Sequence, residues 1–467
     1  MILKNNQIKI DDANIFLHDK LDREESIENL SKLIVKTKEP FVFSVNANWG
    51  AGKTTFIHLW KTYLKKQYDI NSIYFSAWED DFSKEPLISI LGELNSYINN
   101  NYNVDSEVVS SFNKVKSFTG KVIKRGLPAL IKGSTAGVLD LDKGFESAIG
   151  AMAEQTTQEL IENYSNEKNI IVEFKKSVYE VLSKIDSDKP FIIFIDELDR
   201  CRPLYAIELL ERIKHVFGIE NLIFILSIDK KQLAESIKSQ YGNIDTDNYL
   251  RRFIDLEYQL KNNNLDKFCD ALYKKFNLDN ILKTKGIKTE FGDFNHLTVI
   301  KKLVKVFNIS LRQIEQVFTK LHIVFTTIEP QLYESHFRVF VFFEILKSNS
   351  PEKYYDFING KDIANEIKSM VLPFIGSDGT RDISVIIEAT IDSTCKNDEQ
   401  YNLLIMSKEE ELLKINDTSS LKYKKLSWYI NLLKHTPDTW DEYTMNKLID
   451  TVINKIEFTD KFNFEAK

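Results

Sequence analysis

The residues of this chain that could do chemistry begin with a glycine-containing segment at residues 47–54, which reads ANWGAGKT. An apolar run, Phe41 to Val45, precedes it, and a helical pattern from Thr54 to Lys65 follows it. A strand, a glycine-rich turn and a helix in this order can wrap a polyphosphate, because backbone N–H groups and the helix N-terminus point at the anion. The context therefore predicts a phosphate-binding loop in preference to an incidental glycine-rich turn.

Individual residues of this loop have separate expected roles. Gly50 and Gly52 let the backbone approach a phosphate closely. Lys53 can reach the terminal phosphates, and the Thr54 hydroxyl can join the ligand shell of a Mg²⁺ ion. Ala47 occupies the position where the first glycine of such a loop is usual. Alanine is tolerated there because that residue closes the turn without touching phosphate. The predicted nucleotide-contacting residues are Asn48, Trp49, Gly50, Ala51, Gly52, Lys53, Thr54 and Thr55.

Two adjacent carboxylates follow the apolar run Phe191 to Ile195. A continuously apolar run is typical of a strand that is buried on both faces of a parallel sheet, and its carboxyl end would lie beside the phosphate loop. Asp196 is then expected to hold Mg²⁺, usually through water, and Glu197 to polarise an attacking water. The alternative, that these acids only cap a helix, is disfavoured by the phosphate loop upstream.

Further polar residues flank this predicted site. Ser227 and Asp229 end the next apolar run, and either could bond the γ-phosphate or the lytic water, or could merely cap the following helix. Asp199 and Arg200 are expected to form a local ion pair that shapes the loop. Alternatively, Arg200 or Arg202 could reach the nucleotide or a neighbouring subunit.

A parallel sheet is needed to bring these residues together. The β-type runs are Phe41–Val45, Ser72–Ser76, Phe191–Ile195, Leu222–Leu226 and, less clearly, Ile254–Leu260. Helical patterns separate them, so the fold class is α/β with a mostly parallel sheet. Residues 1–77 and 185–260 are expected to form the core, and residues 261–467 a helical lid and an all-helical C-terminal domain.

An insertion of residues 78–184, mostly helical, separates the second and third runs, since a minimal crossover needs only about 10–12 residues. Its segment 108–150 is rich in glycine and basic residues. Residues 108–139 contain no Asp or Glu, and their basic residues are Lys114, Lys116, Lys121, Lys124, Arg125 and Lys132. The favoured interpretation is a solvated flexible loop. The alternative is a mobile segment with weak contact to a membrane surface or nucleic acid.

Composition restricts the class of protein further. The net charge of −7 argues against polyanion binding by the chain as a whole. The cysteines Cys201, Cys269 and Cys395 are odd in number and widely spaced, which indicates a reducing compartment and no disulfide framework. The N-terminus lacks the apolar core of a signal peptide, and no run approaches the ~18–20 apolar residues of a membrane span. We expect a cytoplasmic protein with no transmembrane span.

Four segments together resemble the KAP family of P-loop NTPases over roughly residues 20–260. They are Asp22-Arg23 with the helix after it, the loop NWGAGKTT, the strand end Phe75-Ser76-Ala77-Trp78, and the acidic segment FIDELDRCRP. Ser76 stands where the family has asparagine. The resemblance implies a P-loop sheet of strand order 5-1-4-3-2. Many members carry transmembrane helices where this chain has its polar insertion, and bacterial members often lie in phage-defence loci.

Two later segments resemble nucleotide-sensing elements of related ring-forming ATPases. Arg251 and Arg252 occupy a place where such proteins present an arginine to the γ-phosphate of the adjacent subunit. The alternative is a pair of exposed basic residues before an edge strand. Arg312 resembles the arginine of a helical lid over bound nucleotide, in the first turn of a helix with Ser310 as its N-cap. The alternative for Arg312 is a surface arginine.

The leading hypothesis is an NTPase that binds and hydrolyses ATP with Mg²⁺ and couples nucleotide state to its helical C-terminal region. Its partner would be another copy of the chain or a protein encoded nearby, plausibly in bacterial anti-phage defence. One alternative is a slow nucleotide-gated switch or scaffold. A small-molecule phosphotransferase is disfavoured, because Glu197 beside the metal-binding acid suits a water nucleophile. A DNA motor is disfavoured by the acidic balance.

Overall fold

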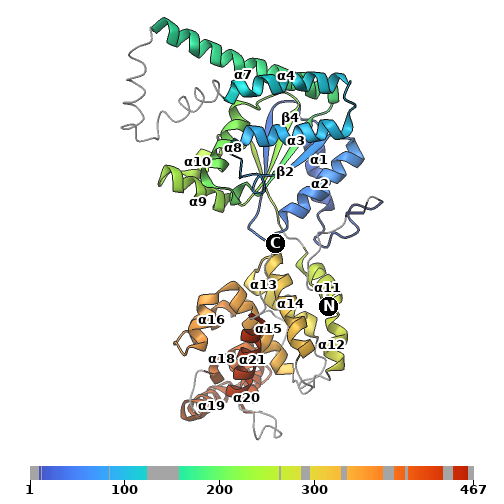
Figure 1. Cartoon of the computed structure of the whole chain (residues 1–467). Helices are drawn as coiled ribbons and strands as arrows, with labels where there is room; N and C mark the ends of the chain where they lie inside the picture. Colours follow the sequence, from blue (N-terminus) through green and yellow to red (C-terminus); the bar gives the residue numbers. More distant parts are fainter. Residues whose placement is uncertain are drawn as a thin grey trace. The chain divides into compact units, whose positions relative to one another are not determined.

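The computed structural model describes most of the chain. The described residues are 10–11, 13–83, 85–123, 157–261, 264–285, 295–327, 334–371, 383–394, 398–434 and 445–460. The chain divides into two compact units, one of residues 7–262 and one that begins at residue 263 (Figure 1). Each unit is described by itself.

The first unit is built on a five-stranded sheet of order β2-β3-β4-β1-β5. Its strands are β1 (Phe41–Asn46), β2 (Ser72–Ser76), β3 (Phe191–Asp196), β4 (Leu222–Ile228) and β5 (Leu256–Gln259). Every neighbouring pair is parallel. The predicted order 5-1-4-3-2 is the same order read from the other edge, so the expected P-loop sheet is confirmed.

Helices cover both faces of this sheet. Phe194 of β3 packs with helices α1 and α2, whereas its neighbours Ile193 and Ile195 pack with helices α3, α4, α7 and α8. Burial on both faces explains why β3 and β4 read as unbroken apolar runs. The helices of this unit are α1 (Glu24–Ile34), α2 (Lys53–Tyr68), α3 (Pro86–Asn101), α4 (Glu107–Lys121), α7 (Thr157–Ile185), α8 (Pro203–His215), α9 (Lys230–Tyr241) and α10 (Thr246–Leu250).

Helix α4 corrects the prediction made for residues 108–139. The expected loop or mobile segment is wrong for the first part of this range, which is helical and packs beside α7 (Figure 1). Val108, Phe112 and Val115 are buried, and their spacing places them on one helical face. Lys114 forms an ion pair with Glu180 at 3.3 Å. The remaining residues, 124–139, lie outside the described residues.

The described residues of the second unit form helices and no strand, as the predicted all-helical C-terminal region requires. They are α11 (Leu265–Lys275), α12 (Leu278–Thr284), α13 (His296–Phe307), α14 (Leu311–Thr327), α15 (Glu334–Asn349), α16 (Pro351–Ile358), α17 (Ala364–Val371), α18 (Ile383–Thr394), α19 (Asp398–Leu413), α20 (Leu421–Lys434) and α21 (Met445–Asp460). No helix in the described parts of either unit is both long and apolar enough to cross a membrane.

Candidate functional site

The loop between β1 and α2 has the backbone conformation that its glycines suggested. Gly50 has a φ of 77° and Gly52 a φ of 78°, and both angles lie in the left-handed region that glycine adopts without strain. Ala47 is buried and donates its backbone N–H to the Ile228 carbonyl at 3.1 Å. Because Ala47 is not among the residues with positive φ, alanine fits where glycine is usual. Thr54 lies in the first turn of α2.

Lys53 is the first residue of α2, and its side chain folds back over the loop. Its ammonium donates to the Ala47 carbonyl at 2.7 Å and to the Asn48 carbonyl at 3.4 Å. Burial lowers the pKa of Lys53, and the nearby carboxylates of Asp199 and Asp229 oppose this shift. The loop therefore holds a cation at its centre with carboxylates around it.

Arg23 holds the loop from the outside. Its guanidinium is buried and donates to the Gly52 carbonyl at 3.1 Å and to the Ala51 carbonyl at 2.9 Å. Burial lowers the pKa of Arg23 to about 10. Sequence reasoning identified Arg23 only through the family resemblance, because an arginine just before a helix carries no local sign of burial.

The two predicted acids stand at the end of β3. Asp196 pairs in register with Ser76 of β2 and with Ser227 of β4. The buried Asp196 carboxylate accepts the Glu197 backbone N–H at 2.9 Å and the Tyr74 hydroxyl at 3.2 Å. The parallel register thus brings polar residues from three strands to the same rim of the sheet.

Glu197 has a φ of 62°, which is unusual for a residue with a side chain. One carboxylate oxygen accepts the Ser76 hydroxyl at 3.3 Å, and the other pairs with the Arg200 guanidinium at 2.5 Å. Burial raises the pKa of Glu197, the positive charge of Arg200 lowers it, and the charge of Asp196 raises it further. In this structure the carboxylate of the predicted base is engaged by two neighbours.

The predicted ion pair between Asp199 and Arg200 is wrong. Arg200 pairs with Glu197 and lies over the Trp78 ring, 5.5 Å from its centroid. Asp199 is buried and accepts the indole N–H of Trp49. Burial of the Asp199 carboxylate favours an N–H donor from the loop over a salt bridge to an arginine that points toward Glu197. Trp49 is therefore tied to the acidic segment.

Arg202 contacts the segment that follows β2. It pairs with Asp81 at 3.2 Å and donates to the Asp81 and Ser83 carbonyls. These bonds connect the start of α8 to the segment after β2.

Ser227 lies near the end of β4, Asp229 is the first residue after that strand, and the two differ in their partners. Asp229 caps α9, accepting the backbone N–H groups of Lys231 at 3.2 Å and Gln232 at 3.4 Å. Its other oxygen accepts the backbone N–H of Trp49 at 3.1 Å, so Asp229 also fixes the phosphate loop. Ser227 is fully buried, and its hydroxyl has no hydrogen-bond partner within the described residues. An unpaired buried hydroxyl at the rim is a candidate contact for a ligand.

The other three predicted arginines belong to other elements of the chain. Arg251 and Arg252 are exposed and follow α10, just before the edge strand β5. Arg312 is exposed in the first turn of α14, in the second compact unit. The N-cap prediction for Ser310 is confirmed, because its hydroxyl accepts the Gln313 N–H at 3.3 Å while its own N–H bonds the Gln313 side chain at 2.8 Å. The catalytic roles of the three arginines stay predictions.

The donor set at the rim fits a magnesium ion that is bound together with phosphate. Within the described residues, no cluster of three or more His, Cys, Asp or Glu side chains could hold a metal by itself. Mg²⁺ usually takes one or two carboxylates, waters and substrate phosphate oxygens. Asp196 and the Thr54 hydroxyl are the side chains here that suit this role.

Comparison with protein families identifies the family of this chain. The KAP family P-loop domain matches residues 23–328, which is more than half of the chain. No curated protein matches. A solved structure, the Aeropyrum pernix ORC2 protein in ADPNP and ADP complexes, matches with 12% identity, a TM-score of 0.34 and 98% coverage of each chain. On the strength of the family match, this chain belongs to the KAP family of P-loop domains.

Proposed function

We propose that this protein binds ATP with Mg²⁺ and hydrolyses it. The observation that carries the proposal is the meeting of β1, β3 and β4 at one rim of the sheet, in parallel register. That register groups the phosphate loop with Asp196, Glu197 and Ser227. The KAP family match supports nucleotide binding.

The loop and its lysine account for nucleotide binding. The Lys53 ammonium bonds loop carbonyls in this structure, and a phosphate oxygen would be a stronger acceptor because the bond is then between opposite charges. Mg²⁺, held by Thr54 and Asp196, would neutralise phosphate charge when bound. The unpaired Ser227 hydroxyl can donate to a phosphate oxygen or to the lytic water.

Glu197 is the proposed base. Its pKa is raised by burial, which makes its carboxylate a better proton acceptor than that of an ordinary glutamate. Glu197 also suits water as the acceptor of the phosphoryl group, which argues against a phosphotransferase. Analysis of the products should find only ADP and inorganic phosphate.

Substitutions at Lys53 and Glu197 test this proposal. Lys53→Ala should abolish ATP binding, measured by calorimetry. Glu197→Gln should bind ATP normally and lower kcat about 100-fold or more, since general base catalysis contributes about that much. The matched control is Glu220→Gln, at an exposed position outside the site. Wild-type turnover by Glu197→Gln would rule out Glu197 as the base.

The ion pair between Glu197 and Arg200 supports a second candidate function, a slow nucleotide-gated switch. The base would act only after a partner or a second subunit releases it. Arg251 and Arg252 are exposed and would be available to an adjacent subunit. Mass measurement with and without a non-hydrolysable ATP analogue tests assembly, and a single slow turnover by the pure protein would favour the switch.

A role in bacterial anti-phage defence is proposed from the family resemblance alone, with the helical unit passing nucleotide state to a partner protein. The test is phage plating on cells that express the wild type or Lys53→Ala. Equal plating on both would count against an ATP-dependent defence role.

A further inference from the structure

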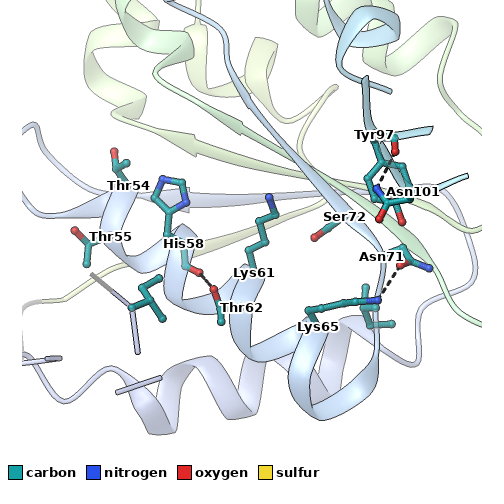
Figure 2. Close-up of a pocket in the computed structure, with 12 residues that line it drawn as sticks. Thr54, Thr55, His58, Lys61, Thr62, Lys65, Asn71, Ser72, Tyr97 and Asn101 are labelled. Atoms are coloured by element: carbon teal, nitrogen blue, oxygen red, sulfur yellow. Dashed lines mark hydrogen bonds between the residues drawn. The ribbon is translucent and has the colours of Figure 1, made fainter. Parts of the chain in front are cut away.

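A pocket of about 660 Å³ lies along one side of α2 (Figure 2). Its walls come from α2, from the turn into β2 and from the last turns of α3. The residues that line it are Ile10, Thr54, Thr55, His58, Lys61, Thr62, Lys65, Ile70, Asn71, Ser72, Tyr97 and Asn101. Its volume is in the range of small-molecule sites.

The pocket adjoins the phosphate site at Thr54 and extends from there along α2 as far as Lys65. Thr54 and Thr55, in the first turn of α2, reach its end, but residues 48–53 do not line it. The acids Asp196 and Glu197 are also absent from its walls. A molecule in this pocket would therefore lie beside the nucleotide-binding helix without occupying the phosphate loop.

The charge of the lining is uniformly positive. Lys61 and Lys65 contribute two ammonium groups, and none of the described Asp or Glu residues lines the pocket. Burial and the charge of Lys61 lower the pKa of His58, so its imidazole is neutral near pH 7. The two lysines extend from α2 on the side where Asn71 and Ser72 lie (Figure 2).

The two lysines differ in their hydrogen-bond and ion-pair partners. Lys65 is neutralised by Asp69 at 2.6 Å and also donates to the Asn71 side chain at 3.1 Å. Lys61 is half-buried and makes no hydrogen bond or ion pair within the described residues. Burial lowers the pKa of Lys61, and the charge of Glu93 opposes that shift. A partly desolvated ammonium without a directly paired anion is unfavourable, and a bound anion in contact with it would reduce the penalty.

The rest of the lining suits a polar molecule attached to such an anion. Ser72 and Thr55 offer hydroxyl groups, Asn101 offers a side-chain amide, and Tyr97 offers an aromatic face. Thr62 and Asn101 already bond the backbone carbonyls of His58 and Tyr97, so part of the wall is held in place (Figure 2).

We propose that this pocket is a second ligand site, which takes a small phosphorylated molecule with its phosphate on Lys61 and Lys65 at the mouth. The proposal does not depend on ATP hydrolysis. A free phosphorylated metabolite and a second nucleotide both carry a phosphate that could bind these lysines. Comparing the binding of one probe of each kind distinguishes them.

The test is calorimetry on the full chain carrying Lys53→Ala, which removes the phosphate-loop lysine. The probes are inorganic pyrophosphate, ribose 5-phosphate and ADP. At least one should bind to Lys53→Ala, and adding Lys61→Met should weaken that binding about tenfold or more, as expected for loss of a charge-assisted bond. A preference for ribose 5-phosphate over ADP would identify a metabolite site, and the reverse a second nucleotide site.

Two further variants keep the result interpretable. Lys66→Met removes an exposed lysine of α2 that does not line the pocket, and it should leave probe binding unchanged. Lys61→Arg keeps the charge and should retain binding. The proposal is overturned if no probe binds to Lys53→Ala, or if Lys61→Met binds as well as Lys61→Arg. If Lys53→Ala alone binds ADP less well than the wild type, that loss reports on the phosphate loop. It does not count for or against the second site.

Discussion

At the scale of single residues, Glu197 has two opposing influences on its charge. Burial raises its pKa, and the ion pair with Arg200 lowers it. A general base must be ionised, so turnover should fall as the pH drops through the pKa of Glu197. The acid limb of the pH–rate profile is therefore expected at a higher pH than for an ordinary glutamate.

Arg200→Ala should move this acid limb to still higher pH, because the group that lowers the pKa of Glu197 is removed. The measurement is kcat for ATP hydrolysis as a function of pH. Arg202→Ala is the matched control, since Arg202 pairs with Asp81 and should leave the limb in place. An unchanged limb in Arg200→Ala would mean that Glu197 does not govern the profile.

The sequence predicted some of these residues and missed others for a physical reason. Lys53 and Asp196 follow from local patterns, a glycine-rich turn and an apolar strand that ends in an acid. The contact of Arg23 with Gly52 joins residues 29 apart, and that of Asp229 with Trp49 joins residues 180 apart. Neither has a local signature. Asp199 and Arg200 are adjacent in sequence, but Arg200 pairs with Glu197 three residues earlier and Asp199 accepts the Trp49 indole N–H.

At the scale of elements, Asp229 serves both α9 and the phosphate loop. Asp229→Ala should lower the free energy of unfolding by about 1 kcal/mol, as loss of an N-cap does. It should also speed hydrogen exchange at the Trp49 amide, which loses its acceptor. The measurements are urea unfolding and amide exchange on the nucleotide-free protein.

Ser106→Ala is the control for this prediction, because Ser106 caps α4 by accepting the Val109 N–H at 3.3 Å. It should cause a similar loss of stability and leave exchange at Trp49 unchanged. Asp229→Asn should preserve the cap, since asparagine is as good an N-cap as aspartate. Equal exchange at Trp49 in all three variants would contradict the link between α9 and the loop.

Strands were easier to predict than the inserted helices. β3 and β4 are buried on both faces, and this burial appears in the sequence as unbroken apolar runs. In α4 the basic composition of residues 108–139 favoured a loop, although Val108, Phe112 and Val115 have the apolar spacing of a helix. The edge strand β5 is exposed along most of its length, so its limits are weakly marked.

At the scale of the whole molecule, the predicted phosphate site lies within one of the two compact units, residues 7–262. A fragment of residues 1–262 should therefore unfold cooperatively and still bind ATP. Arg312 lies in the other unit, so the proposed lid role predicts that the fragment loses turnover. Calorimetry and phosphate release, compared with the full chain, measure the two properties.

Arg312→Ala in the full chain separates the arginine from the rest of its unit. If the arginine folds over nucleotide, this variant should lose turnover about tenfold or more while keeping its stability. The control is Lys283→Ala, which removes an exposed cation paired with Asp279. Wild-type turnover in Arg312→Ala would contradict the lid role. It would favour the alternative interpretation, that Arg312 is only a surface arginine.

The position of Trp49 gives the protein a built-in optical reporter. Its indole ring is partly exposed; the indole N–H donates to Asp199, and the Trp49 backbone N–H donates to Asp229. Phosphate entering the loop would change the charge and solvent around the ring, so ATP should shift the intrinsic fluorescence. Trp49→Phe should abolish that shift, while Lys53→Ala should retain the emission and lose its response to ATP.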